Sequence, residues 1–143
     1  MEMFEKTRVG KHEIWFDSSA GIVYEVFDGL LNADEMERLL GATTKWLEEG
    51  TPAFYLMDNR NLTGLTTDGR KAVALLGETL DRDTYCAIFG ASFAVRTVLN
   101  MVFSARELTS RRPFKVVIRF VADASEARAW LVERKNVCAE RVR

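Results

Sequence analysis

The sequence predicts a single α/β domain over residues 1–143, with about five strands in a mostly parallel sheet, an N-terminal hairpin and four helices. Short apolar runs alternate with stretches of helical periodicity beyond residue 30. Each helical stretch is long enough to return the chain to the same end of a sheet, as parallel pairing requires. The 143 residues are 48% hydrophobic and 29% charged, a composition that suits one globular domain.

The N-terminal part of the chain predicts a β-hairpin. Hydrophobic residues alternate over residues 12–16 and again over 22–27, and small, turn-prone residues occupy 18–21 between them. His12 is the one histidine of the chain and begins the first of these runs. Because no catalytic partner is placed beside it by the sequence, we expect His12 to be an edge-strand or surface residue.

Helix starts are marked by capping residues. Asn32 is followed three residues later by Glu35, which predicts a capping box and a helix that continues to Gly50. The capping residues predicted for the three later helices are Thr66 or Thr67, Ser92 and Asp123. In the last helix Trp130 and Leu131 share an apolar side, and we expect them to pack on the sheet.

Three short apolar runs, residues 53–57, 85–89 and 115–121, predict the parallel strands. The first run ends at Asp58 and Asn59, a pair that favours a turn. Ligands bind open parallel sheets at the carboxyl ends of the strands. Asp58 is therefore either a residue of such a site or an ordinary turn former.

Charge and residue usage exclude several classes of function. Twenty basic and 21 acidic residues give a net charge of −1, which argues against nucleic-acid binding. No apolar run is long enough for a transmembrane segment, and residues 1–10 lack a signal-peptide core, so we expect a cytoplasmic protein. Cys86 and Cys138 lie in different segments, which argues against a disulfide framework or a paired-cysteine metal site. We expect no catalytic, cofactor-binding or metal-binding residues, and therefore no enzyme.

The order of elements resembles the SpoIIAA-like branch of the STAS superfamily, whose parent members are anti-sigma-factor antagonists. The segments that carry the resemblance are Tyr55-Leu56-Met57-Asp58, Ile88-Phe89-Gly90-Ala91-Ser92 and residues 120–131. It extends over nearly the whole chain and implies a bacterial, non-enzymatic regulatory module that acts by contact with a protein partner. The branch also resembles the lipid-carrying Sec14-type fold, which implies an alternative role as a carrier or sensor of an apolar or lipid-like ligand.

The resemblance also implies a partner site in the loop before the second helix. In the parent antagonists a serine of this loop is phosphorylated by a partner kinase. The matching stretch is Thr66-Thr67-Asp68-Gly69, with Thr67 at the position of that serine, and together with Asp58 it forms the candidate partner surface. The alternative is structural: a threonine caps the second helix, and Asp68 in the first turn interacts favourably with the helix dipole.

The predicted third helix carries more apolar surface than one core-facing stripe requires. The stripe consists of Val95, Val98, Leu99 and Val102. Phe93, Met101 and Phe103 extend it, and such a surface is normally covered. We expect internal packing first, then a homodimer, then an apolar ligand as the covering.

Overall fold

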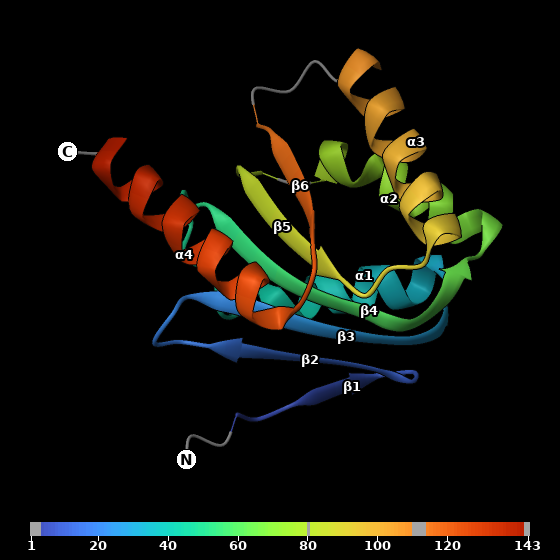
Figure 1. Ribbon diagram of the computed structural model, residues 1–143, viewed down its shortest axis with the longest axis horizontal. Coiled ribbons are helices and arrows are strands. Elements are labelled where there is room, and N and C mark those ends of the chain that lie inside the picture. The colour runs from blue at the N-terminus through green and yellow to red at the C-terminus, as the bar shows by residue number, and fades with distance from the viewer. Residues whose placement is uncertain (1–3, 80, 110–113, 142–143) are drawn as a thin grey trace.

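The computed structural model describes residues 4–79, 81–109 and 114–141, in which six strands form one mixed sheet. The strands are β1 (Thr7–Val9), β2 (His12–Asp17), β3 (Ile22–Leu31), β4 (Ala53–Leu65), β5 (Thr84–Phe89) and β6 (Val116–Val121). The helices are α1 (Ala33–Thr43), α2 (Thr67–Thr79), α3 (Phe93–Thr109) and α4 (Ala124–Arg141). The strands lie side by side in the order of the sequence, β1 to β6 (Figure 1). The predicted α/β class is confirmed, with one strand more than expected.

The predicted hairpin is confirmed as the antiparallel pair β2 and β3. Its turn is closed by the Asp17 carboxylate, which accepts hydrogen bonds from the backbone N–H groups of Ser19 at 3.1 Å and Ala20 at 3.2 Å. Gly21 completes the turn with a φ of 70°, a conformation that favours glycine. The short strand β1, which sequence patterning did not predict, pairs antiparallel with the outer side of β2.

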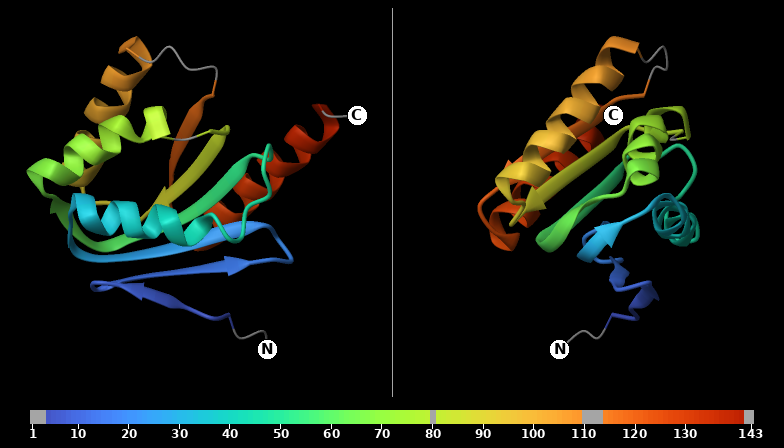
Figure 2. Two further views of the ribbon diagram at one scale, coloured as in Figure 1. Left: turned by 180° about the vertical axis from the view of Figure 1, so that it is seen from behind. Right: turned by 90° about the vertical axis from the view of Figure 1, so that its right-hand side faces the viewer.

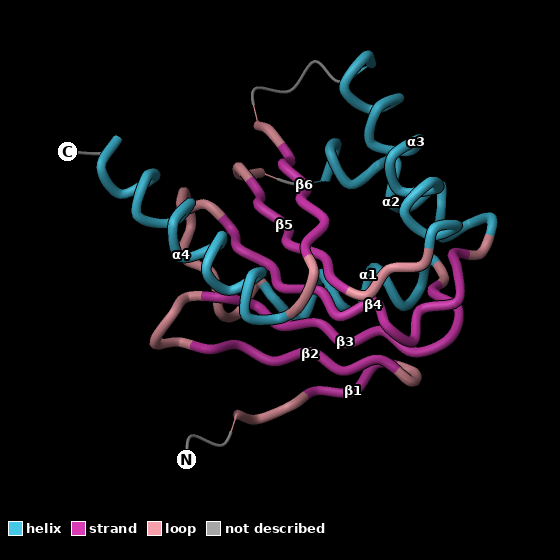
Figure 3. Tube along the Cα trace, in the orientation of Figure 1, coloured by secondary structure: helices cyan, strands magenta, loops and turns pink. Residues whose placement is uncertain are grey.

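The topology separates the helices into two layers. Strands β3 to β6 are parallel, and α1, α2 and α3 connect them in turn. Because each crossover adds the next strand on the same side and crossovers of this kind are right-handed, the three helices lie on one face of the sheet. Helix α4 follows the last strand and packs on the other face, against β4, β5 and β6 (Figures 2 and 3).

Each face of the sheet has its own hydrophobic core, because successive strand residues point to opposite sides. Beneath α1, α2 and α3 the core includes Val23, Tyr55, Cys86, Leu39 and Leu99. Beneath α4 it includes Phe54, Leu56, Ala87, Ala127 and Leu131. Trp130 packs against this second core, so the expectation for Trp130 and Leu131 is confirmed.

Three predicted helix caps are present in the structure. The Asn32 side chain accepts from the Glu35 N–H at 2.8 Å, and the Glu35 carboxylate accepts from the Asn32 N–H at 3.1 Å, which is the predicted capping box. Ser92 Oγ accepts from the Val95 N–H at 3.2 Å. Asp123 Oδ1 accepts from the Glu126 N–H at 2.8 Å.

The first helix is shorter, and the following strand longer, than predicted. Helix α1 ends at Thr43 rather than Gly50, and the Thr43 hydroxyl bonds back to the Leu40 carbonyl at 2.7 Å. Strand β4 continues past Asp58 to Leu65 instead of turning. Its second half pairs with the end of β3, from Asp28↔Asn61 to Leu31↔Leu65, and this ladder outweighs the local turn preference.

The expectation that His12 is a surface or edge residue is wrong. Its side chain is buried, because it packs edge-on against the Phe27 ring and lies against the start of α1. His12 Nδ1 accepts a hydrogen bond from the Asp28 N–H at 3.0 Å. Its Nε2 lies 3.3 Å from Glu35 Oε1, without the alignment of a hydrogen bond. His12 therefore joins the hairpin to the start of α1.

Candidate functional site

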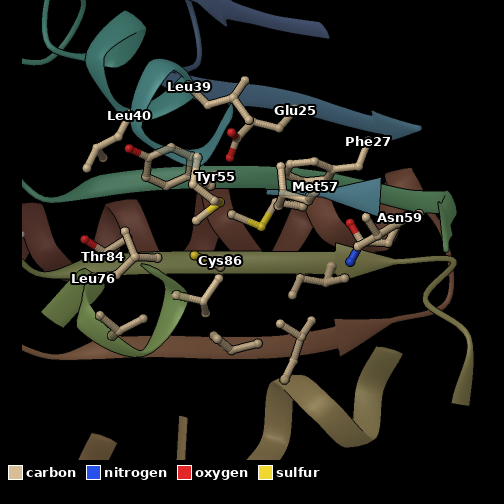
Figure 4. A pocket seen from close by; sticks show the side chains of 18 of the residues that line it. Glu25, Phe27, Leu39, Leu40, Tyr55, Met57, Asn59, Leu76, Thr84 and Cys86 are labelled. Carbon is tan, nitrogen blue, oxygen red and sulfur yellow. The ribbon is translucent and has the colours of Figure 1, made fainter. Parts of the chain in front are cut away.

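A cavity of about 100 Å³ lies between the sheet and the layer formed by α1, α2 and α3 (Figure 4). Strands β3, β4, β5 and β6 form its floor, and the helices contribute side chains such as Met36, Leu39, Val73 and Leu99. The lining is mostly apolar, and neither lysine nor arginine occurs among its described residues. The site is therefore a hydrophobic pocket within the fold.

The pocket forms because the helix layer does not fill the space over the centre of the sheet. Met57 lies on the central strand β4, between two other strands, yet it is only half-buried. Its neighbour Leu56 faces α4 and is fully buried. Protein interiors are normally packed like organic crystals, so an apolar space of this size is a specific feature of the fold.

One acidic side chain reaches this apolar pocket. Glu25 occupies an inward position of β3, is 6% exposed and lines the cavity (Figure 4). Among the described residues its carboxyl group has neither a hydrogen bond nor an ion pair. Burial raises its pKa from 4.5 to about 8, because a low-dielectric site disfavours the charged form. The group is therefore mainly protonated at neutral pH in the empty protein.

The remaining polar groups of the pocket are uncharged. Asn59 Oδ1 is buried without a partner among the described residues. The Tyr55 hydroxyl donates to Thr43 Oγ1 at 3.4 Å. Burial, together with the nearby Glu25 carboxyl group, raises the pKa of the Tyr55 hydroxyl and of the Cys86 thiol. Both therefore keep their protons, and the pocket offers hydrogen-bonding groups in apolar surroundings.

The predicted partner loop forms the cap of α2. Thr66 Oγ1 accepts from the Gly69 N–H at 3.1 Å and donates to the Asp68 carboxylate, and this second bond lowers the pKa of Asp68. Gly69 packs so closely that a Cβ atom would collide with the carbonyl oxygen of Leu31. Thr67 is exposed, and none of the four loop residues lines the cavity.

Asp58 lies apart from that loop and from the cavity. Its side chain is on the opposite face of β4 from Asn59, and the rest of the strand separates it from Thr66. Arg60 Nη2 contacts Asp58 Oδ2 at 2.8 Å, and the Arg60 N–H donates to Oδ1 at 3.0 Å. Burial alone would raise the pKa of Asp58, but these bonds and the Arg60 charge lower it. Asp58 is thus held in a local ion pair.

The wide apolar face of α3 is only partly covered. Phe103 is half-buried, packs on the core and lines the cavity. Phe93 and Met101 are 86% and 67% exposed, so the expectation of internal packing is wrong for these two. Their side of α3 is not covered, because among the described elements α3 packs chiefly against α2 and β4.

Sequence patterning missed the pocket and its two unpartnered polar side chains, Glu25 and Asn59. A signal for Glu25 was present, because the strand alternates Val23, Glu25 and Phe27 on one side and all three face the helices. An acidic residue at the centre of such a run is unusual. Asn59 carried no comparable signal, since a turn was expected there.

Within the described residues, no helix combines the length and apolarity that a membrane crossing needs.

No family model and no curated protein matches the sequence. Among solved structures, a crystal structure of an uncharacterized DUF3478-family protein from Shewanella loihica PV-4, described as having a SpoIIAA-like fold, is similar to this chain. The two are 16% identical, the match covers 90% of this chain and 92% of the other, and the TM-score is 0.51. A likeness at this identity concerns the fold. The chain is therefore an α/β protein with a SpoIIAA-like fold.

Proposed function

We propose that the protein is a non-enzymatic binding module that takes a small apolar ligand into the cavity beneath α1, α2 and α3. The observation that carries this proposal is the cavity itself, about 100 Å³ of mostly apolar space with a few polar groups at its floor. A pocket of this composition is the usual form of a small-molecule site. An engineered apolar cavity of roughly 150 Å³ is known to bind benzene, so this smaller space suits a ligand or chain segment of about four heavy atoms.

Binding without turnover is supported by the chemistry of the lining residues. The Cys86 thiol is buried, and its raised pKa disfavours the reactive thiolate. His12 does not line the cavity and is held by the Asp28 N–H. A nucleophile with an adjacent base is therefore not assembled among the described lining residues, and we assign the pocket to ligand binding.

Contact with a regulatory protein partner, or with a second copy of the chain, is the second candidate function. The observation that favours it is the exposure of Phe93 and Met101 on α3. The same helix contributes Leu99 and Phe103 to the cavity. A ligand in the pocket would therefore contact α3 and change the position of this helix and of its exposed side chains. A ligand sensor that reports to a partner would combine both roles. Thr67, exposed at the start of α2, remains the candidate phosphorylation site of such a module.

Cavity filling tests the ligand proposal. We expect 1-propanol to shift the NMR signals of lining residues in the wild-type protein and to bind about tenfold more weakly to Val73→Phe, whose larger side chain occupies the pocket. Val102→Phe is the matched control, because Val102 packs on the same core without lining the cavity. Equal binding by both variants, or no binding by the wild-type protein, would contradict the proposal.

A further inference from the structure

We propose that the ligand of this cavity is a small apolar amine, whose ammonium group binds the Glu25 carboxylate. This inference rests on the proposed function and adds the chemical class of the ligand. Its basis is the pair of unpartnered polar side chains that reach an otherwise apolar pocket from neighbouring strands. Buried polar groups are normally satisfied, so two without partners at one cavity indicate a missing partner.

The register of the sheet places the two residues on the same face of neighbouring strands. Glu25 on β3 is paired with Met57 on β4, and Asn59 follows Met57 by two residues. Alternate residues share a face, so Glu25, Met57 and Asn59 all point toward the helix layer (Figure 4). Asn59 is offset from Glu25 by about 7 Å along the strand, and Figure 4 shows Phe27 and Met57 between the two groups in this view, so Glu25 alone is the contact for the head group.

The charge distribution favours a cation over other head groups. No described lysine, arginine or histidine lines the cavity. Arg82, which lies close enough to influence Tyr55, is bound instead to the carbonyl oxygens of Glu48 at 2.8 Å and Thr51 at 3.2 Å. An ammonium group would supply the absent positive charge and three hydrogen-bond donors. A carboxylate ligand would bring a negative charge into the apolar space next to Glu25, and a pure hydrocarbon would leave the Glu25 carboxyl group unsatisfied.

Binding of the amine has a defined proton balance. In the empty pocket Glu25 is mainly protonated at neutral pH. When an ammonium ion enters and the ion pair forms, the proton of Glu25 passes to the solvent, so up to one proton is released for each amine bound. The other titratable side chains at the cavity are Tyr55 on β4 and Cys86 on β5, and both stay neutral. The described lining residues of α1, α2, α3 and β6 carry no titratable group.

Calorimetric titration with three probes of one carbon number tests this assignment. Propylamine, 1-propanol and propanoate each have three carbon atoms and carry different head groups. We expect the amine to bind the wild-type protein at pH 8 about tenfold more tightly than the alcohol, and the carboxylate to bind most weakly. Amine affinity should rise between pH 6 and pH 8, with proton release measured in buffers of different ionisation enthalpy.

The variant Glu25→Gln tests the contact with the ligand's head group separately from binding of its apolar part in the pocket. We expect it to lose the preference for the amine over the alcohol, with circular dichroism confirming its fold. Equal affinity for amine and alcohol in the wild-type protein, or an amine affinity that does not change with pH, would overturn the amine assignment while leaving a binding pocket. Absence of binding by all three probes would overturn the proposed function as well.

Discussion

Glu25 is unfavourable for the stability of the fold but suited to the proposed contact with a ligand. An isolated carboxyl group in an apolar site costs free energy, whether it is neutral with unmade hydrogen bonds or charged without a counterion. In this fold it lies between Val23 and Phe27 on the inward side of β3, where an apolar residue would pack without that cost. Its presence is explained if the cost is offset when a ligand binds.

The raised pKa of Glu25 predicts that stability falls as the pH rises. The unfolded chain loses this proton near pH 4.5, whereas the folded protein keeps it until about pH 8. Between these values the unfolded state binds fewer protons, so the free energy of unfolding decreases with pH, by up to about 5 kcal/mol over the whole window. Urea unfolding of the ligand-free protein at pH 5, 7 and 9 measures this effect.

Glu25→Gln is the comparison for that series, because it keeps the shape and removes the titration. We expect its free energy of unfolding to be nearly constant between pH 5 and pH 9. Asp17 and Asp58 do not interfere, since their lowered pKa values place their contributions in the acid range below this window. A decline of the same size in Glu25→Gln would assign the pH dependence to other groups.

At the scale of single elements, the start of α2 contains one threonine that caps the helix and a second whose side chain is exposed. Thr66 makes the capping hydrogen bond to the Gly69 N–H, and Thr67 is exposed beside it. We expect Thr66→Ala to lower the free energy of unfolding by about 1 kcal/mol and Thr67→Ala to change it by less than about 0.5 kcal/mol. Urea denaturation of both variants measures the difference, and the reverse order would assign the cap to Thr67.

Helix α4 is held to the sheet mainly by Leu131. This side chain is completely buried, whereas Trp130 contacts Tyr85 edge-on and remains partly exposed. We expect Leu131→Ala to cost about 3 kcal/mol and Trp130→Ala to cost less, because part of the tryptophan surface already faces solvent. Thermal melting of the two variants orders them, and equal losses would show that the tryptophan contributes as much as the leucine.

The helices and strands also show which features of the fold could be predicted from sequence patterns. Helix starts were predictable, because a cap such as Asn32, Ser92 or Asp123 acts through the N–H groups of the next turn and needs no distant partner. The length of β4 was not, because residues after Asp58 are held by the ladder to β3. Strand β1 was missed for the same reason, since its three residues depend on pairing with β2.

The candidate site was less predictable than the fold. A role for an apolar ligand followed from the resemblance to a lipid-carrying fold, but the pocket depends on how three helices rest on four strands. No local sequence pattern predicts an unfilled volume between helices and a sheet. Phe103 lines the pocket, whereas Phe93 and Met101 on the same helix face away from it. The different exposure of these side chains arises from the packing of α3 against α2 and β4. Helical periodicity alone does not predict this packing.

At the scale of the whole molecule, the two helix layers differ in how completely they are packed. The α4 layer closes one face of the sheet over Ala127 and Leu131, which are fully buried. The layer of α1, α2 and α3 encloses the cavity and leaves the apolar side chains of Leu75, Phe93 and Met101 exposed. Candidate interactions with a ligand and with a partner therefore belong to the same layer, which is the arrangement that a ligand sensor requires.

Met101→Lys tests whether the exposed side of α3 is an association surface. Met101 is 67% exposed, so a charge there should change the free energy of unfolding by less than about 0.5 kcal/mol. If two copies associate through this face, the lysines would oppose it, and light scattering should show a dimer that becomes a monomer while circular dichroism stays unchanged. Val132→Lys, the same kind of change at an exposed valine of α4 on the other face of the sheet, is the control. A monomeric wild-type protein would exclude the homodimer and leave a different partner for this surface, whereas unfolding of Met101→Lys would show that Met101 is packed in solution.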